Sequence, residues 1–400
     1  MSLRSLSLPL TALLGAALSL LPGCKTSTAS GPPPPSGPQQ PPSPPPPPPE
    51  ADAWKRARVG DRVAYTFSTT RSAGPRGSGP TSTLGGQVAL EVVAVQPPWL
   101  WVRLSFMDEA GKPLSTVRLA QELVLPVRAD ATRPLEVTPA GEATAETASG
   151  AGRTWEALRY VSDQRPVDGP LRARVYAREP GPLYLTHGLV QAETTLSGFG
   201  AAGGSTLTLR EVREGSATTS APAPALERPL GPGAYYDRRV DQAPTSGVHR
   251  VCFSAERGYL LRTEGPVDTQ AAPCADFSQA EPEPLEEVLL NLAGEAVFAG
   301  NWPPTGASAK KGTFTVEGRD VPALIEERTE KVEGVERVFT DTYAEDPWAP
   351  GLAGLPHEAR FQPLANTTER VVGKGKGKGK RESEGGTRLV RWGTWLGGAR

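Results

Sequence analysis

Three thiols are the most reactive side chains in this sequence, since a thiol can bond to a lipid, a metal ion or another thiol. Cys24 lies near the amino terminus, whereas Cys252 and Cys274 lie 22 residues apart. If the chain is exported, we expect the second pair to form a disulfide, which would stabilise the fold by about 3 kcal/mol. Two buried free thiols are the alternative. With Cys24 modified and the other pair bonded, no thiol nucleophile would remain.

The residues before Cys24 have the composition of an export signal. Arg4 precedes an apolar run of 16 residues, Leu6–Leu21. This run is shorter than the roughly 20 residues that a membrane-spanning helix needs. The following Leu21–Cys24, Leu-Pro-Gly-Cys, resembles the lipobox of bacterial lipoproteins, although Pro22 departs from the usual pattern.

The resemblance to a lipoprotein signal implies cleavage after residue 23 and a diacylglyceryl thioether on Cys24, which would hold the protein on a membrane. Lys25 follows the cysteine where an inner-membrane signal has Asp. The sorting rule of enteric-type lipoproteins then implies the outer membrane, on its periplasmic or surface face. Ordinary signal-peptide cleavage after Ala29 is the alternative. Residues 24–52 are rich in proline and predict a disordered, extended linker.

No catalytic or metal-binding motif follows the linker. The histidines are scattered, and no nucleophile elbow, P-loop or dinucleotide glycine pattern is present, so we expect no catalytic residue, metal or cofactor. Carboxylates cluster at Asp341, Glu345 and Asp346, beside Tyr343 and Trp348. They could hold Ca²⁺ or face a sugar, but acidic side chains at a strand end more often face solvent.

Alternating glycine and lysine at 373–381 predict a solvated loop, because this composition neither packs nor forms a stable helix. Its cations could also contact anionic polymers or headgroups, with each lysine near a charged surface contributing about 1 kcal/mol. These candidate contacts are Lys374, Lys376, Lys378, Lys380 and Arg381.

Aromatic side chains form two groups, Trp99 with Trp101 and Trp392 with Trp395. Trp99 and Trp101 flank one residue and so share a face of a strand. They could be ligand platforms, but tryptophan also commonly fills small β cores, which is the simpler interpretation.

Bulk composition excludes one class of partner. The net charge is −1, with 43 Lys and Arg against 44 Asp and Glu, and a nucleic-acid-binding protein usually carries a basic stripe and a high pI. No nucleic-acid partner is therefore expected.

Short β-rich segments separated by glycine and proline turns dominate the remainder. We predict a mainly β fold with a little α: two tandem antiparallel modules, half-barrel or sandwich-like, at 53–213 and 234–400, joined by a linker at 214–233. One helix is predicted at Leu285–Ala293, with Gly294 just past its end. The predicted strands include Arg62–Phe67, Gln87–Val95, Leu100–Phe106, Trp155–Tyr160, Leu171–Tyr176, Leu183–Thr186, Ser205–Val212, His249–Phe253, Gly258–Thr263, Val335–Tyr343 and Thr387–Trp392.

The two modules share a weak internal repeat, which indicates a duplication; chance similarity among glycine-rich strands is the alternative. The paired segments, in constant order, are Gly152–Leu158 with Gly318–Leu324, Asp168–Gly169 with Glu333–Gly334, Tyr176–Glu179 with Tyr343–Asp346, and Gly188–Leu189 with Gly351–Leu352.

The first module also resembles β-rich domains of unknown function in bacterial envelope lipoproteins, through Val59–Phe67, Gly152–Tyr160 and Glu179–Val190. Some of those domains are similar to the half-barrels of periplasmic lipid carriers, and no catalytic motif is carried over. The sequence therefore predicts an envelope lipoprotein, anchored by Cys24, with a non-catalytic binding or structural role toward an envelope protein or lipid. A lipid carrier and a hydrolase of wall or polysaccharide material are the alternatives.

Overall fold

The computed structural model describes the chain between Ala53 and Leu396, with internal gaps. The described residues are 53–73, 79–114, 116, 118–119, 122–130, 139–165, 169–198, 201–216, 222–241, 246–267, 274, 276–297, 302–306, 308–372 and 380–396. The predicted signal peptide, Cys24 and the proline-rich segment lie outside them.

Alternating apolar residues form the strands of the first half of this body, which we define as β1 to β9. On β1, Val63, Tyr65 and Phe67 point to one face and are almost completely buried. Hydrogen bonds order the strands as β5-β6-β7-β8-β9-β1-β2-β3-β4, all antiparallel. The elements are β1 (Arg62–Ala73), β2 (Thr81–Gln96), β3 (Trp99–Met107), β4 (Glu122–Arg128), β5 (Glu142–Gly150), β6 (Arg153–Asp163), β7 (Leu171–Ala177), the 3-10 helix η3 (Gly181–Thr186), β8 (Leu189–Gly198) and β9 (Ala201–Arg213).

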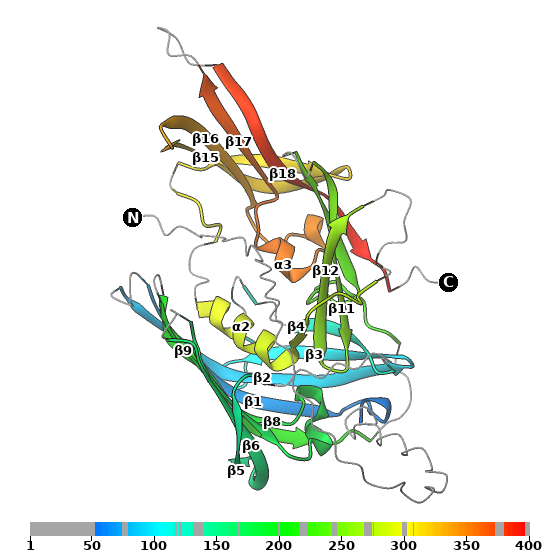
Figure 1. Cartoon of the computed structure of the whole chain (residues 1–400). Helices are drawn as coiled ribbons and strands as arrows, with labels where there is room; N and C mark the ends of the chain where they lie inside the picture. The colour runs from blue at the N-terminus through cyan, green and yellow to red at the C-terminus, as the bar shows by residue number, and fades with distance from the viewer. Residues whose placement is uncertain are drawn as a thin grey trace, which may run out of the picture. The chain divides into compact units, whose positions relative to one another are not determined.

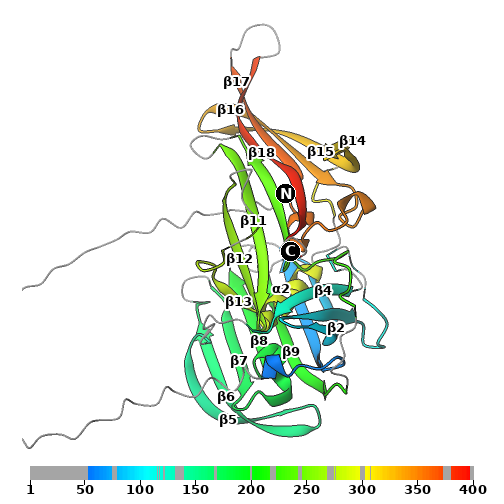
Figure 2. The same ribbon diagram turned by 90° about the vertical axis from the view of Figure 1, so that its right-hand side faces the viewer.

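The second half, β10 to β18, repeats this order as β14-β15-β16-β17-β18-β10-β11-β12, with antiparallel ladders throughout and β13 beyond β12 (Figure 2). In each half the first strand pairs with the last. The elements are β10 (Ala234–Val240), β11 (Gly247–Glu256), β12 (Tyr259–Pro266), β13 (Pro282–Pro284), α2 (Leu285–Val297), β14 (Lys310–Val316), β15 (Arg319–Val332), β16 (Val335–Ala344), η4 (Pro350–Leu352), α3 (His357–Arg360), β17 (Ala365–Val372) and β18 (Lys380–Thr394).

Local irregularities repeat as well. The β1–β9 ladder bulges between Ala64 and Tyr65, and the β10–β18 ladder bulges between Asp237 and Arg238. The two-residue turns Ala151-Gly152 and Glu317-Gly318 both have positive φ, the conformation that suits a tight hairpin. The halves thus match strand for strand, as a duplication requires.

One pair of the predicted repeat is placed differently. Leu189 begins β8, whereas Gly351 lies in η4, before β17. The counterpart of Gly351 by position is Gly181. Each glycine lies in a 3-10 helix, η4 or η3, between corresponding strands, and each directly follows a proline.

The two halves belong to one mixed sheet. A parallel bridge between Arg128 of β4 and Glu256 of β11 connects the ladders. The predicted linker is partly built into this junction: Pro229 forms a bridge with Val124, and Leu230 is buried. No helix among the described residues is long and apolar enough to cross a membrane.

Helix α2 comes from the second half but packs on β1, β2 and β9 of the first (Figure 1). Leu285, Leu289 and Leu292 are buried in the same apolar cluster as the β1 and β2 side chains. The predicted helix is therefore confirmed, as is its role as cover for a sheet, but the sheet that it covers is that of the other half.

Two local predictions are wrong. Leu183–Thr186 forms η3 rather than a strand, because Pro182 and the left-handed His187 enclose a tight turn. Gly294 lies inside α2 rather than after it. A Cβ there would lie 2.5 Å from an Arg71 nitrogen, so this glycine permits close approach of the helix to β1.

Candidate functional site

The most site-like feature of the described residues is a cavity of about 410 Å³ between the two halves. Its walls come from α2, from α3, from β12 with the segment before β13, and from Arg118 of the first half. The lining residues are Arg118, Leu230, Phe253, Leu260, Leu261, Arg262, Glu281, Glu283, Val288, Asn291, Leu292, Glu295, His357, Glu358, Phe361 and Gln362. We call this the interface cavity; its volume suits a small organic ligand.

Apolar side chains form the base of the interface cavity. Leu261, Val288 and Leu292 belong to the apolar clusters of the fold and are almost fully buried. They are held by strand alternation on β12 and by the helical spacing of α2. The base can therefore accommodate an aliphatic portion of a ligand.

Carboxylates surround the mouth. Glu283 and Glu295 keep a large solvent-exposed surface. The neighbouring protein atoms nevertheless remove part of the water around each carboxylate, and this raises the pKa of both. The charges of Glu287, Glu295 and Glu358 raise the pKa of Glu283 further, and a hydrogen bond from Asn291 opposes this. For Glu295 the charge of Arg118 opposes the shift. These side chains repel one another, and a cation between them would relieve that repulsion.

Glu358 differs because its oxygens already have partners. It accepts hydrogen bonds from Tyr236 Oη at 2.8 Å and from Arg262 Nε at 3.2 Å, and Gln362 donates a longer one. Arg262 also pairs with Glu264. Glu358 and Arg262 thus largely neutralise each other in the wall of the cavity.

His357 is the most buried polar group in the lining, with 6% of its surface exposed. Its Nε2 lies 2.8 Å from the carbonyl oxygen of Arg118 and therefore carries the proton. Burial, together with the positive charges of Arg360 and Arg118, lowers the pKa of His357 to about 4. The ring is then neutral at pH 7, and its Nδ1, an acceptor, has no hydrogen-bond partner among the described residues.

Arg118 joins the halves at this cavity. Its guanidinium lies 4.6 Å from the centre of the Phe361 ring and 5.4 Å from that of Trp302. Burial lowers its pKa, and the Glu295 charge opposes the shift. This cation is engaged by aromatic faces of the second half.

A second polar cluster lies at the start of α2. Glu286 is 1% exposed; it accepts a hydrogen bond from Tyr176 Oη at 2.9 Å and lies 3.1 Å from His187 Nδ1. Beside it, Arg174 donates two hydrogen bonds to Glu287. Because these contacts join η3 and β7 to α2, we interpret the cluster as a polar contact between the halves.

Gly258 permits that cluster to form. It has a φ of +84°, and a Cβ there would lie 3.0 Å from His187 Nε2 and from the Trp54 ring. A side chain at this position would press against the His187 ring, which lies beside Glu286.

A second cavity, of about 440 Å³, adjoins the start of the body. Four arginines and three carboxylates line it, so the charges nearly balance: Arg56, Arg58, Arg178 and Arg213 with Asp61, Glu179 and Glu214. Asp61, also in the lining, is saturated by Tyr184 Oη and two backbone amides. The lining of this cavity therefore favours neither a cationic nor an anionic ligand strongly.

The predicted cationic loop is only partly described. Lys374, Lys376 and Lys378 lie outside the described residues, together with Cys24. Lys380 and Arg381 belong to β18 rather than to a loop, because they pair with Val372 and Val371 of β17. Arg381 contacts Glu327 at 2.9 Å and Glu369 at 3.5 Å, so its charge is balanced by the sheet.

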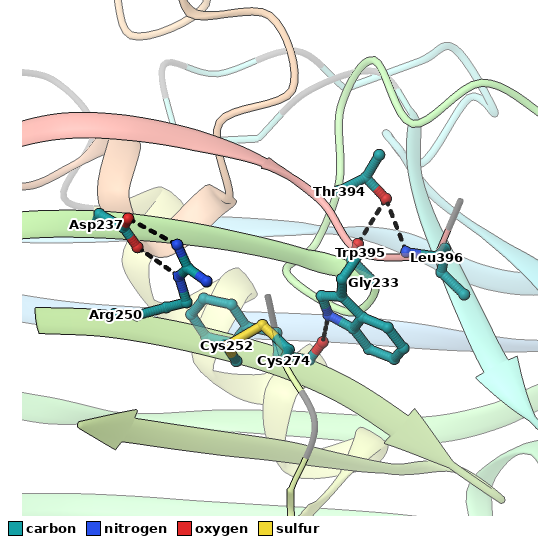
Figure 3. Close-up of a disulfide and its surroundings, with 9 residues drawn as sticks. Gly233, Asp237, Arg250, Cys252, Cys274, Thr394, Trp395 and Leu396 are labelled. Atoms are coloured by element: carbon teal, nitrogen blue, oxygen red, sulfur yellow. Dashed lines mark hydrogen bonds and ion pairs between the residues drawn. A yellow bond between two sulfur atoms is a disulfide. The ribbon is translucent and has the colours of Figure 1, made fainter. Parts of the chain in front are cut away.

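Cys252 and Cys274 form a disulfide in the structure, with their Cα atoms 5.9 Å apart (Figure 3). Beside it, Arg250 of β11 donates two hydrogen bonds to the fully buried Asp237 of β10. The disulfide thus attaches the segment before β13 to a rigid strand pair.

The acidic cluster of β16 serves structural contacts. Asp341 pairs with Arg328 at 2.6 Å, Glu345 pairs with Lys311, and Asp346 accepts a hydrogen bond from the Trp348 backbone. No group of three or more His, Cys, Asp or Glu side chains in the described part of the chain could hold a metal ion.

The four tryptophans are packing residues. Trp101 and Trp392 are buried, and Trp392 Nε1 donates to the carbonyl oxygen of Ala353. Trp395 Nε1 donates a hydrogen bond to the carbonyl oxygen of Phe253, and its ring packs edge-on against Trp99 of the first half. The interpretation as core is supported for Trp101 and Trp392, whereas Trp99 and Trp395 are half-buried and pack against each other.

Sequence reasoning missed the interface cavity entirely. Its carboxylates lie at positions 281 to 295 and 358, and Arg118 is more than 160 residues from the first of them. The only available signal was the run of glutamates before and within the predicted helix.

A model of a protein family of unknown function, DUF6068, matches residues 4–400. The chain belongs to this family. No curated protein matches the sequence. The family match covers both halves and the segment that precedes them. A β-rich body of unknown function, as the sequence indicated, agrees with this assignment.

Proposed function

We propose that this protein is an envelope lipoprotein, anchored through Cys24, that binds an envelope component in the interface cavity without chemical conversion. The observation that carries the proposal is the composition of the cavity: an apolar base with a few polar groups around it, contributed by both halves. The Leu21–Cys24 motif and the proline-rich segment support the anchor and a stalk.

Because both halves line the interface cavity, a bound ligand would affect the structure of the protein. A ligand held between α2, α3 and Arg118 would contact both halves at once. It would thus stabilise their junction as well as occupy a site. This fits a binding or structural role better than it fits a carrier, which must release its cargo.

The binding test compares the full chain with two variants purified from envelope membranes. Asn291→Trp places a large ring at the mouth of the cavity from an exposed position on α2, and Glu142→Trp makes a comparable change on exposed β5. Mass spectrometry should find a co-purified molecule with the wild type and Glu142→Trp that is depleted with Asn291→Trp. Equal recovery from all three would contradict binding in this cavity.

The anchor is tested separately by labelling cells with a radiolabelled fatty acid. The wild-type chain should take up label and Cys24→Ser should not. Label on the serine variant would refute the lipid anchor, and it would leave the binding proposal unaffected.

A hydrolase is the second candidate, because carboxylates with raised pKa values share the interface cavity. A general acid and a carboxylate partner are what glycoside hydrolysis requires. Turnover of cell-wall fragments by the wild type that is abolished in Glu295→Gln would favour the enzyme. The lipid-carrier alternative has less support, because α2 occupies the face of β1, β2 and β9 where an acyl chain would lie.

A further inference from the structure

We propose that the interface cavity selects an alkylammonium ligand: a primary amine, protonated at neutral pH, on an aliphatic chain. This inference rests on the proposed binding function and names its ligand class. Three features of the lining favour it: the surplus of carboxylates, a buried histidine whose second ring nitrogen is an acceptor without a partner among the described residues, and the apolar base.

The charges of the lining do not balance. Arg262 and Glu358 neutralise each other in the wall, at 3.2 Å. Of the remaining charged residues, Glu281, Glu283 and Glu295 face a single cation, Arg118. The guanidinium of Arg118 also lies against aromatic rings, so part of its interaction is directed away from the carboxylates. A cationic group would complete the charge balance, whereas a ligand that presents only a carboxylate or phosphate would add repulsion.

His357 supplies the second observation. Its Nε2–H is used by the Arg118 carbonyl, which leaves Nδ1 as an acceptor. The side chain lines the cavity, is more than nine-tenths buried, and has no partner for Nδ1 among the described residues. An acceptor without a partner on a side chain that lines the cavity favours a ligand that donates a hydrogen bond, and an ammonium group has three donors.

The apolar base explains the second part of the ligand. Leu261, Val288 and Leu292 offer no hydrogen bonds, so the group that lies against them should be aliphatic. An amine-bearing lipid headgroup and a free aliphatic diamine both have this chemistry, and the test must separate these two sources.

The test uses the full-length lipidated protein in nanodiscs and three probes of equal chain length: hexylammonium, hexanol and hexanoate. Isothermal titration should give binding in the order hexylammonium, hexanol, hexanoate. Because a charge-assisted hydrogen bond is lost in each case, Glu283→Gln and Glu295→Gln should each weaken hexylammonium binding about tenfold. Glu142→Gln, an exposed glutamate on β5, is the matched control and should leave the affinity unchanged.

Competition identifies the source. Displacement of hexylammonium by glycerophosphoethanolamine indicates a headgroup, and displacement by 1,4-diaminobutane indicates a free diamine; either supports the ligand class. Preferential binding of hexanoate or hexanol overturns this inference but leaves the cavity as a binding site. If none of the three probes binds, or if the glutamine variants bind hexylammonium as the wild type does, the carboxylates do not select the ligand and the inference is wrong.

Discussion

The dependence of the first half on a helix from the second gives the sharpest stability prediction. Leu289 of α2 is fully buried in the apolar cluster that includes β1 and β2 side chains. Leu289→Ala removes the buried part of the side chain and leaves a cavity, a change that costs about 3 kcal/mol in a tightly packed core. That is a large share of the roughly 5–15 kcal/mol by which a folded domain is stable.

The location of the effect matters as much as its size. Because α2 packs on β1, β2 and β9, Leu289→Ala should lower the protection of amides in those strands, which lie at least 70 residues away in the sequence. Hydrogen exchange followed by mass spectrometry measures protection strand by strand, and urea denaturation gives the total loss.

A matched variant separates this effect from general destabilisation. Leu389 of β18 is also fully buried, but it lies in the second apolar cluster, with Tyr236 and Phe253. Leu389→Ala should mainly affect β10 and β18. If Leu289→Ala costs less than about 1 kcal/mol, or loosens only second-half strands, the reasoning that α2 forms the core of the first half is refuted.

Three further predictions concern buried polar groups and the disulfide. The pKa of His357 is about 4 in the folded chain and 6.5 when exposed, so the unfolded state takes up a proton first and stability should fall as pH drops from 6.5 to 4. The total loss is about 3 kcal/mol, and urea titrations at several pH values should show it in the wild type but not in His357→Gln. Glu286→Ala leaves the Tyr176 hydroxyl without its acceptor and should cost about 3 kcal/mol in urea, whereas Glu286→Gln should cost less. Reduction of Cys252–Cys274 should lower the free energy of unfolding by about 3 kcal/mol, measured by urea denaturation with and without reductant.

Each of these predictions has an outcome that would contradict it. A pH dependence that is identical in wild type and His357→Gln would mean that another group titrates in this window. Equal stability of wild type and Glu286→Ala would show that the cluster at the start of α2 contributes nothing to the junction. Two free thiols in mass spectrometry without reductant would remove the disulfide from the protein.

The alternation of apolar and polar residues determined most of the strands, since this pattern is local and a half-buried sheet requires it. Segments such as Arg62–Phe67 and Thr387–Trp392 lie within β1 and β18. β5 was missed because Glu142–Gly150 is mostly exposed and lacks apolar alternation. The mainly β class, a weak internal repeat and the α2 helix were readable from local sequence, whereas the order of the strands in each half was not.

Tertiary structure alone decided where those elements meet. Nothing in the sequence of α2 indicates that its leucines cover the first half rather than the second. An amphipathic pattern shows that one face of a helix is buried, but it does not show which strands cover that face. The interface cavity has the same origin. It brings together Arg118, Glu283, Glu295 and His357 from three separate segments, and their juxtaposition places the buried His357 side chain beside unbalanced carboxylates. The reverse holds for Cys24, whose proposed lipidation depends only on a linear motif and lies outside the described structure.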